Sequence, residues 1–168
     1  MNKNKEAYYD NRIVFKPWGH EYVVYRYKDI LSVTLLNINP TESTSLHCHP
    51  TKKTGFVLLD GKALIQLGLW KKGSEIYESP SKLMIRTGLF HSIKCISKKP
   101  LLALEFETPI NKNDLVRFDD KYGREKRPYE QGKKFKNLKK DKNYYKIYNF
   151  EEKIEYVFGK TIVKLEIH

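Results

Sequence analysis

The sequence contains little cysteine and no long apolar run. Cys48 and Cys95 are its only cysteines, too few for a disulfide framework, so both are expected to be reduced thiols. No apolar run approaches the roughly 18 residues that a membrane-spanning helix needs. The opening residues, MNKNKEAYYDN, contain no apolar segment that would act as a secretory signal. We therefore expect a protein of the cytoplasm that has no membrane partner.

Residues 1–110 also lack a long segment with the 3.6-residue apolar period of a helix, which argues against a Rossmann-type fold. The 12 tyrosines and 8 phenylalanines favour β-strands instead. Short strand-like segments separated by turn residues predict an all-β sandwich or barrel, and Asp60-Gly61 is the strongest hairpin signal. Strands are expected at His20–Tyr27, Ile30–Ile38, Thr44–His49, Thr54–Leu59, Lys62–Leu69, Glu75–Tyr77, Leu83–Arg86, Ser92–Ser97 and Leu101–Glu107.

The length of 168 residues suits one domain with a single core. The expected parts are a polar arm over residues 1–12, a barrel over 13–110 and an irregular extension over 111–168 that packs on the barrel or on a partner subunit. Within the extension, Asn113–Phe118 predicts one helical turn capped by an asparagine. The segments Tyr144–Phe150 and Thr161–Ile167 predict two further strands.

The formal net charge of +12 raises the question of a nucleic-acid partner. Part of the excess comes from a lysine-rich run, KKFKNLKKDKN, over residues 133–143. This run suits either a solvated linker or a basic patch for phosphorylated ligands. No recognised nucleic-acid-binding module is present, so nucleic acid is not expected as a partner.

Three histidines are candidates for a metal site. His47 and His49 are separated by one residue in a strand-like segment, so their side chains point to the same face. His91 lies in a later strand-like run, and a sheet that brings this run opposite would let three ring nitrogens converge. Such a set suits a divalent metal such as Zn, Fe, Mn or Ni. Alternatively, the histidines are ordinary polar residues of a pocket that binds no metal.

This histidine pattern resembles the first motif of the cupin family. His47 and His49 match its His-x-His, and Gly61 closes the motif at the expected distance. Thr41 stands in place of the opening glycine, and Thr54 stands where the family has a glutamate ligand. With three histidines and no carboxylate, the ligand set would be neutral.

The second cupin motif is also matched in part. Gly88 and His91 fit, while Arg86 replaces the usual proline and Cys95 replaces the closing asparagine. The resemblance covers about residues 15–108. It implies a double-stranded β-helix, the jelly-roll form of an all-β fold, with a ligand site inside the barrel. Cys95 is read either as an additional ligand or as a small apolar filler.

A closer resemblance starts at Lys16-Pro17-Trp18-Gly19, which is similar to the opening of the cupin domain of bacterial type II mannose-6-phosphate isomerases. The segment ETPINKNDLVRFDDKYGREKRPYE resembles the tail of small cupins associated with bacterial surface-polysaccharide synthesis. These resemblances imply a homodimer and a sugar phosphate or nucleotide sugar as ligand.

Further site residues are predicted around the histidines. Glu105 and Glu107 share one face of a strand, where they are catalytic or metal-binding if they point inward and solvated charges if they point outward. Thr54, Gln66 and Arg86 are candidates for binding substrate.

The favoured function is that of a metal-dependent isomerase or epimerase of an activated sugar, in which a side chain moves the proton. The alternatives are a three-histidine Fe(II) thiol dioxygenase and a sugar-binding or regulatory cupin without catalysis.

Overall fold

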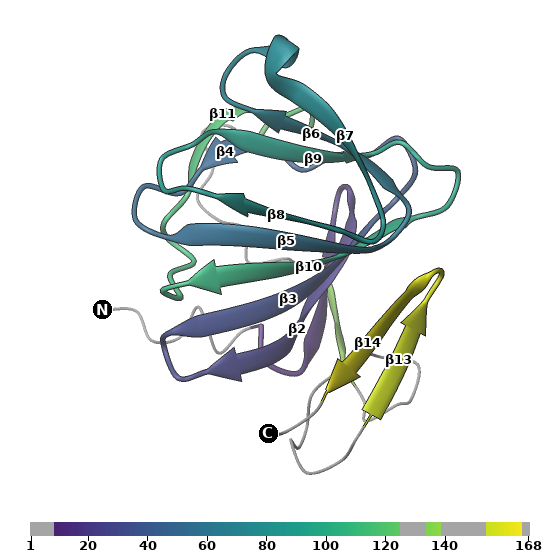
Figure 1. Cartoon of the computed structure of the whole chain (residues 1–168). Coiled ribbons are helices and arrows are strands. Elements are labelled where there is room, and N and C mark those ends of the chain that lie inside the picture. The colour runs from purple at the N-terminus through teal and green to yellow at the C-terminus, as the bar shows by residue number, and fades with distance from the viewer. Residues whose placement is uncertain (1–8, 125–133, 139–153, 166–168) are drawn as a thin grey trace.

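The computed structural model describes residues 9–124, 134–138 and 154–165 of the chain, and in these ranges the fold is all-β (Figure 1). Two antiparallel sheets face each other. In spatial order, the larger sheet contains β12 (Phe135–Asn137), β1 (Arg12–Lys16), β2 (Gly19–Tyr27), β3 (Leu31–Ile38), β10 (Leu101–Thr108), β5 (Lys53–Asp60) and β8 (Ser81–Ile85). The smaller sheet contains β11 (Val116–Asp119), β4 (Leu46–Cys48), β9 (His91–Cys95), β6 (Lys62–Leu67) and β7 (Ser74–Glu78).

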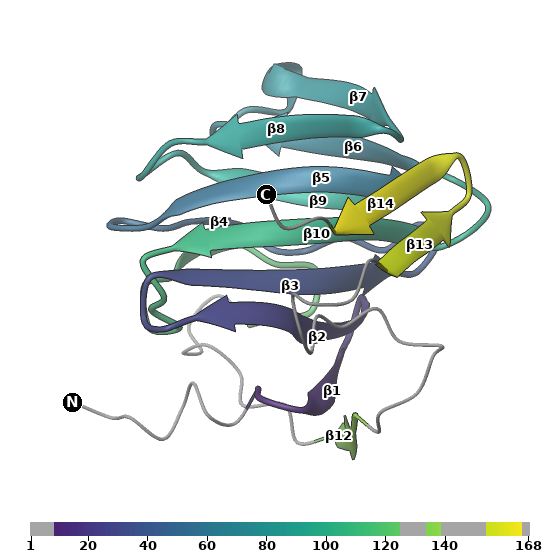
Figure 2. The same cartoon turned by 60° about the horizontal axis from the view of Figure 1, so that its bottom comes forward.

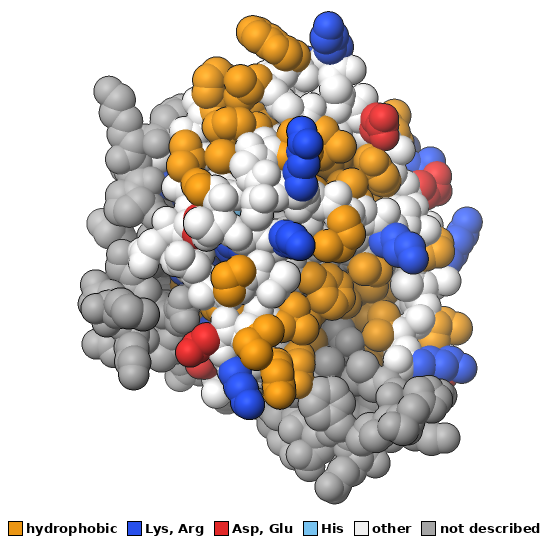
Figure 3. All heavy atoms as spheres, turned by 60° about the vertical axis from the view of Figure 1, so that its left-hand side comes forward, with side chains coloured by type: hydrophobic (Ala, Val, Ile, Leu, Met, Phe, Trp, Pro, Cys, Tyr) orange, Lys and Arg blue, Asp and Glu red, His pale blue; other side chains and the backbone are white. Residues whose placement is uncertain are grey.

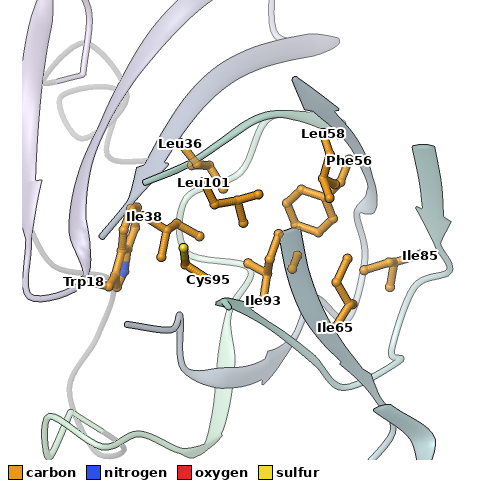
Figure 4. Close-up of a cluster of buried hydrophobic side chains, with 11 residues drawn as sticks. Trp18, Leu36, Ile38, Phe56, Leu58, Ile65, Ile85, Ile93, Cys95 and Leu101 are labelled. Carbon is orange, nitrogen blue, oxygen red and sulfur yellow. The ribbon is translucent and has the colours of Figure 1, made fainter. Parts of the chain in front are cut away.

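The main core lies between these two sheets (Figure 4). Successive strand residues point to opposite faces, so the inward set of each strand is apolar. Trp18, Ile38 and Cys95 pack at one end, and Ile85 packs at the other. The remaining members are Leu36, Phe56, Leu58, Ala63, Ile65, Ile93 and Leu101. Cys95 therefore acts as a core filler rather than as a metal ligand.

A hairpin formed by β13 (Ile154–Phe158) and β14 (Thr161–Leu165) lies against the outer face of the larger sheet (Figure 2). Tyr156, Phe158 and Val163 pack on a second apolar cluster. That cluster uses the strand residues that alternate with the main core, such as Leu35 and Leu59. The strand expected over Thr161–Ile167 is confirmed in its described part, whereas Tyr144–Phe150 falls outside the described residues.

Two local predictions are wrong. Asp60-Gly61 does not form a hairpin, because β5 and β6 lie in different sheets and each pairs with other strands. Gly61, with φ of +97°, instead turns the chain from one sheet to the other. The helical turn over Asn113–Phe118 is replaced by β11, because this segment pairs with the edge of β4. A turn just before it uses Asn111, whose side-chain oxygen accepts the backbone N–H of Asn113.

Beyond residue 110, β11 and β12 hydrogen-bond to the two sheets, while the division of the chain into three parts stays a prediction. No helix in the described ranges is long and apolar enough to cross a membrane. Basic side chains are spread among apolar ones on one side of the molecule (Figure 3). The charge excess is therefore not confined to residues 133–143.

Gly19 opens β2 with φ of +145°, and a Cβ there would lie 2.0 Å from the backbone oxygen of Asn37. We predict that Gly19→Ala lowers the free energy of unfolding by roughly 3 kcal/mol or more, because backbone must move. Gly68→Ala is the matched control: φ is +85°, but nothing lies within 4 Å, so only strain of about 1–2 kcal/mol is expected. Urea unfolding measures both, and equal losses would contradict the clash.

Candidate metal centre

The three histidines meet at one end of the barrel. His47 on β4 and His91 on β9 are direct partners across the two strands, and His49 follows the end of β4. The ring centroid of His47 lies 4.5 Å from that of His91 and 4.9 Å from that of His49. The ring centroids of His49 and His91 are 5.4 Å apart. Antiparallel pairing of β4 with β9 thus produces the arrangement that local spacing left open.

Backbone carbonyls orient all three rings. Each ring donates its Nδ1–H to a carbonyl oxygen: His47 to Ser45 at 2.8 Å, His49 to Asp114 at 2.6 Å and His91 to Leu89 at 2.9 Å. This leaves Nε2 as the atom with a lone pair. The Nε2 atoms of His49 and His91 are buried and have no hydrogen-bond partner among the described residues. An unpartnered lone pair in a buried site is costly, so the donor set fits a bound cation.

The same surroundings keep the imidazoles neutral. Burial, followed by the nearby Lys52 ammonium, lowers the pKa of His49 to about 3. Burial lowers the pKa of His91 to about 4, with Lys52 adding to it. The pKa of His47 falls well below its usual value because of burial and the two other histidines. Neutral imidazole is the form that ligates a metal.

Two carboxyl groups on β10 point into the barrel beside the histidines, so the face of β10 that carries them is turned inward. Glu105 and Glu107 lie beside His49, with candidate ligand atoms within 4.8 Å of one another. The neutral set of three histidines therefore stays a prediction, and His49 with Glu105 and Glu107 forms a second group that could hold a metal. Glu107 is the direct cross-strand partner of Thr54, so a carboxylate stands one strand away from the position where the family motif has its glutamate. Thr54 itself is buried next to it.

Glu107 is held between two buried lysines. Lys52 donates to its Oε1, and Lys112 donates to its Oε2 at 2.7 Å. All three side chains are at most 3% exposed. Burial alone would raise the pKa of Glu107, but the two ammonium groups outweigh it and hold that pKa well below its usual range. Glu107 also raises the pKa of Lys112 against the opposing effect of burial.

The pKa of Glu105 shifts in the opposite direction from that of Glu107. Burial and the negative charge of Glu107 raise the pKa of Glu105 to about 8. Two neighbouring carboxyl groups with separated pKa values are typical of acid–base sites, where one group stays ionised and the other exchanges a proton.

A cavity of about 560 Å³, measured out to its open mouth, is lined by two of the histidines and by both glutamates. Besides His47, His49, Glu105 and Glu107, its lining includes Lys16, Trp18, Glu21, Phe56, Arg117 and Arg124. Arg117 on β11 is the cross-strand partner of His47. Two of the cations are paired within the site, Lys16 with Glu21 at 3.4 Å and Arg124 with Asp120 at 2.6 Å.

Gln66 and Arg86 do not line this cavity. Gln66 lies on the outer face of β6, where its amide donates to the carbonyl of Gly68 at 3.1 Å. Arg86 follows β8 and is exposed. Sequence reasoning missed Lys52, Lys112 and Arg117. Lysines in turns usually face solvent, and only the pairing of β11 with β4 brings Arg117 to the histidines.

Residues 3–120 match the family described as mannose-6-phosphate isomerase C-terminal. The chain belongs to this family. A putative mannose-1-phosphate guanylyltransferase of Vibrio cholerae serotype O1 is 27% identical over 124 residues, which cover 71% of this chain and 25% of the relative. The chain thus spans about a quarter of that curated relative's length.

Solved structures with the same fold include CapF, a capsular polysaccharide assembling protein from Staphylococcus aureus. It is 18% identical, with a TM-score of 0.54, over 64% of this chain and 34% of CapF. Another is oxalate decarboxylase of Bacillus subtilis, described with Mn(II) centres, which is 17% identical with a TM-score of 0.54 over 63% of this chain and 29% of the enzyme. At these identities, the likeness shows the double-stranded β-helix fold.

We predict that Glu107→Gln lowers the free energy of unfolding by about 3–5 kcal/mol, because it removes the carboxylate that forms ion pairs with the buried ammonium groups of Lys52 and Lys112. Glu78→Gln breaks an exposed ion pair with Lys62 and should leave the stability unchanged. Chemical denaturation measures both variants. Equal stabilities of the Glu107 and Glu78 variants would rule out a buried ionic group.

Stability should also fall as pH rises from about 6.5 to 8 in metal-free protein. Folded Glu105 keeps its proton up to about pH 8, whereas the unfolded chain loses it near 4.5, so folding weakens by up to ~1.4 kcal/mol per pH unit in that window. The pKa values of the histidines are lowered in the folded protein, so their contribution to the stability is fully present above pH 6.5 and does not change in this window. Urea unfolding across this window should show the fall, and Glu105→Gln should remove it. A slope that survives in the variant would assign it to another group.

Proposed function

We propose that the chain is a metal-dependent isomerase or epimerase that acts on a sugar phosphate or nucleotide sugar in bacterial surface-polysaccharide synthesis. The observation that carries this is a group of three oriented, neutral imidazoles next to Glu105, a carboxyl group that lines the cavity and has its pKa raised to about 8. The family's description and the relative's name, a mannose-1-phosphate guanylyltransferase, support a sugar substrate.

His47, His49 and His91 would hold the metal through Nε2, since their Nδ1 atoms are already engaged. Zn, Fe, Mn and Ni all suit such a set, and a neighbour of the same fold is described with Mn(II). When bound, a divalent metal supplies Lewis acidity toward a sugar carbonyl or hydroxyl pair.

Glu105 is the residue proposed to move the proton. Isomerisation or epimerisation needs one group that removes a proton from carbon and returns it, and this group works best when its pKa is near the working pH. Glu105 lines the cavity beside His49, and its neighbour Glu107 is fully occupied by Lys52 and Lys112. Glu107 would thus raise the pKa of Glu105 toward the working pH, where the ionised carboxylate of Glu105 takes up the proton and then returns it.

Arg117 is the residue proposed to bind the phosphate. It lines the cavity directly across from His47, and a guanidinium can bind two phosphate oxygens at once. Lys16 and Arg124 line the same space but are paired with Glu21 and Asp120. A sugar phosphate would match this cavity, because its phosphate can bind the cations and its ring can pack on the apolar side chains of the wall.

The thiol dioxygenase alternative rests on three histidine ligands without the motif glutamate, and this set is unchanged. The sugar hypothesis is preferred because of the family's description and the relative's name. A sugar-binding cupin without catalysis stays as the outcome to be separated by experiment. The homodimer and the cytoplasmic location remain predictions.

We predict that His91→Gln abolishes metal binding. Plasma spectrometry on wild type should find about one metal ion per chain, and the variant should retain almost none because one of three ligands is lost. His20→Gln is the control, since His20 lies outside the cavity and contacts Phe15. A chelator should lower the melting temperature of wild type but not of His91→Gln. Metal retained in full by His91→Gln would overturn the ligand assignment.

Catalysis is tested by solvent exchange. Metal-loaded protein incubated with candidate sugar phosphates in D₂O should incorporate deuterium into the sugar. Glu105→Gln should slow this about 10²–10⁴-fold without changing the metal content. Exchange that persists at the wild-type rate in Glu105→Gln would remove this residue from the reaction. Bound sugar without any exchange would favour the non-catalytic alternative.

A further inference from the structure

A second hollow lies on the outside of the smaller sheet, lined by residues of β4, β6, β9, β11 and the start of β7. These strands form the upper part of the molecule in Figure 1. Its volume is about 1110 Å³, including the open mouth. Strand alternation separates it from the barrel interior: Ile65 and Ile93 point into the core, whereas Gln66, Ser92 and Lys94 line the hollow. None of the three histidines lines it.

The lining combines apolar and hydroxyl-bearing side chains. Leu46 and Leu64 provide apolar surface, and Phe118, 58% exposed, provides an aromatic ring. The hydroxyl groups come from Ser43, Thr44, Ser74 and Ser92, and Gln66 adds an amide. A saccharide ring has apolar C–H faces and a rim of hydroxyl groups, so this combination matches it on both counts.

The charges in the hollow favour an anion. Lys71, Lys94 and Lys121 line it together with one carboxylate, Asp119. Lys121 is paired at 2.5 Å with Glu42, which also accepts a hydrogen bond from the hydroxyl of a tyrosine. Lys71 and Lys94 are exposed and make no ion pair within the described part of the chain. Two unpaired ammonium groups are thus available to a ligand, and Asp119 can accept its hydroxyl groups.

We propose that this hollow binds an acidic saccharide, that is, a sugar chain bearing carboxylate or phosphate groups. Lys71 and Lys94 bind the acidic groups, and Phe118 packs against a ring face. Two side chains that the proposed reaction leaves unused, Gln66 and Lys94, gain a role here. The site is independent of the metal centre, because the sheet formed by β4 and β9 lies between the hollow and the rings of the histidines.

The test is calorimetric titration of the metal-free full chain with an oligogalacturonate, and with a malto-oligosaccharide of equal length as the neutral comparator. The acidic chain should bind, and the neutral one should bind at least about tenfold more weakly. The double variant Lys71→Glu/Lys94→Glu should lose about tenfold or more in affinity.

The matched control is Lys82→Glu/Lys160→Glu, which changes the net charge equally at two exposed lysines outside the hollow. This control should bind as wild type does. Phe118→Ala should weaken binding about threefold to tenfold with the salt dependence unchanged, since it removes packing and no charge. His91→Gln should have no effect.

Several results would overturn the proposal. Equal losses in the two charge-reversed double variants would show that the acidic chain responds to overall charge and not to this hollow. Equal binding of the neutral comparator would remove the role of the lysines. Loss of binding in His91→Gln would place the ligand in the barrel cavity, and absence of any binding to wild type would end the proposal outright.

Discussion

The buried ionic group of Glu107 with Lys52 and Lys112 sets the electrostatics of the whole site. It connects β10 with Lys52, just before β5, and with Lys112, which follows β10, and its three side chains have almost no contact with water. Lys52 helps keep the histidines neutral, and the charge of Glu107 helps keep Glu105 protonated. The exclusion of water strengthens these interactions. It also makes a buried charge costly when its partner is removed.

The barrel is divided into an apolar end and a polar end. Both ends use the same strands: β5 supplies Phe56 and Leu58 to the core and Thr54 to the neighbourhood of Glu107. Packing of the core fixes the strands, so side chains one or two residues further along are held without flexible connections. This rigidity is what holds His47, His91 and Arg117 side by side on three adjacent strands.

The strand alternation and the His-x-His spacing were readable in the sequence, and they predicted the all-β fold and the shared face of His47 and His49, whereas the approach of His91 depended on the pairing of β4 with β9. The prediction of a hairpin at Asp60-Gly61 was wrong, because this dipeptide indicates only a tight turn. Which strands pair depends on the rest of the sheet, and β5 and β6 lie in different sheets. Asn113–Phe118 failed for a similar reason, since the edge of β4 offered hydrogen bonds that a single helical turn could not match.

The sequence by itself determined which residues share a face, because the two-residue period of a strand is a local property. Only the tertiary structure decided that Glu105 and Glu107 point inward, that Lys52 and Lys112 neutralise one of them, and that Gln66 and Arg86 lie elsewhere. These outcomes depend on which strands become neighbours and on how much water they exclude. Both are settled by contacts between residues far apart in the chain, which no local pattern records.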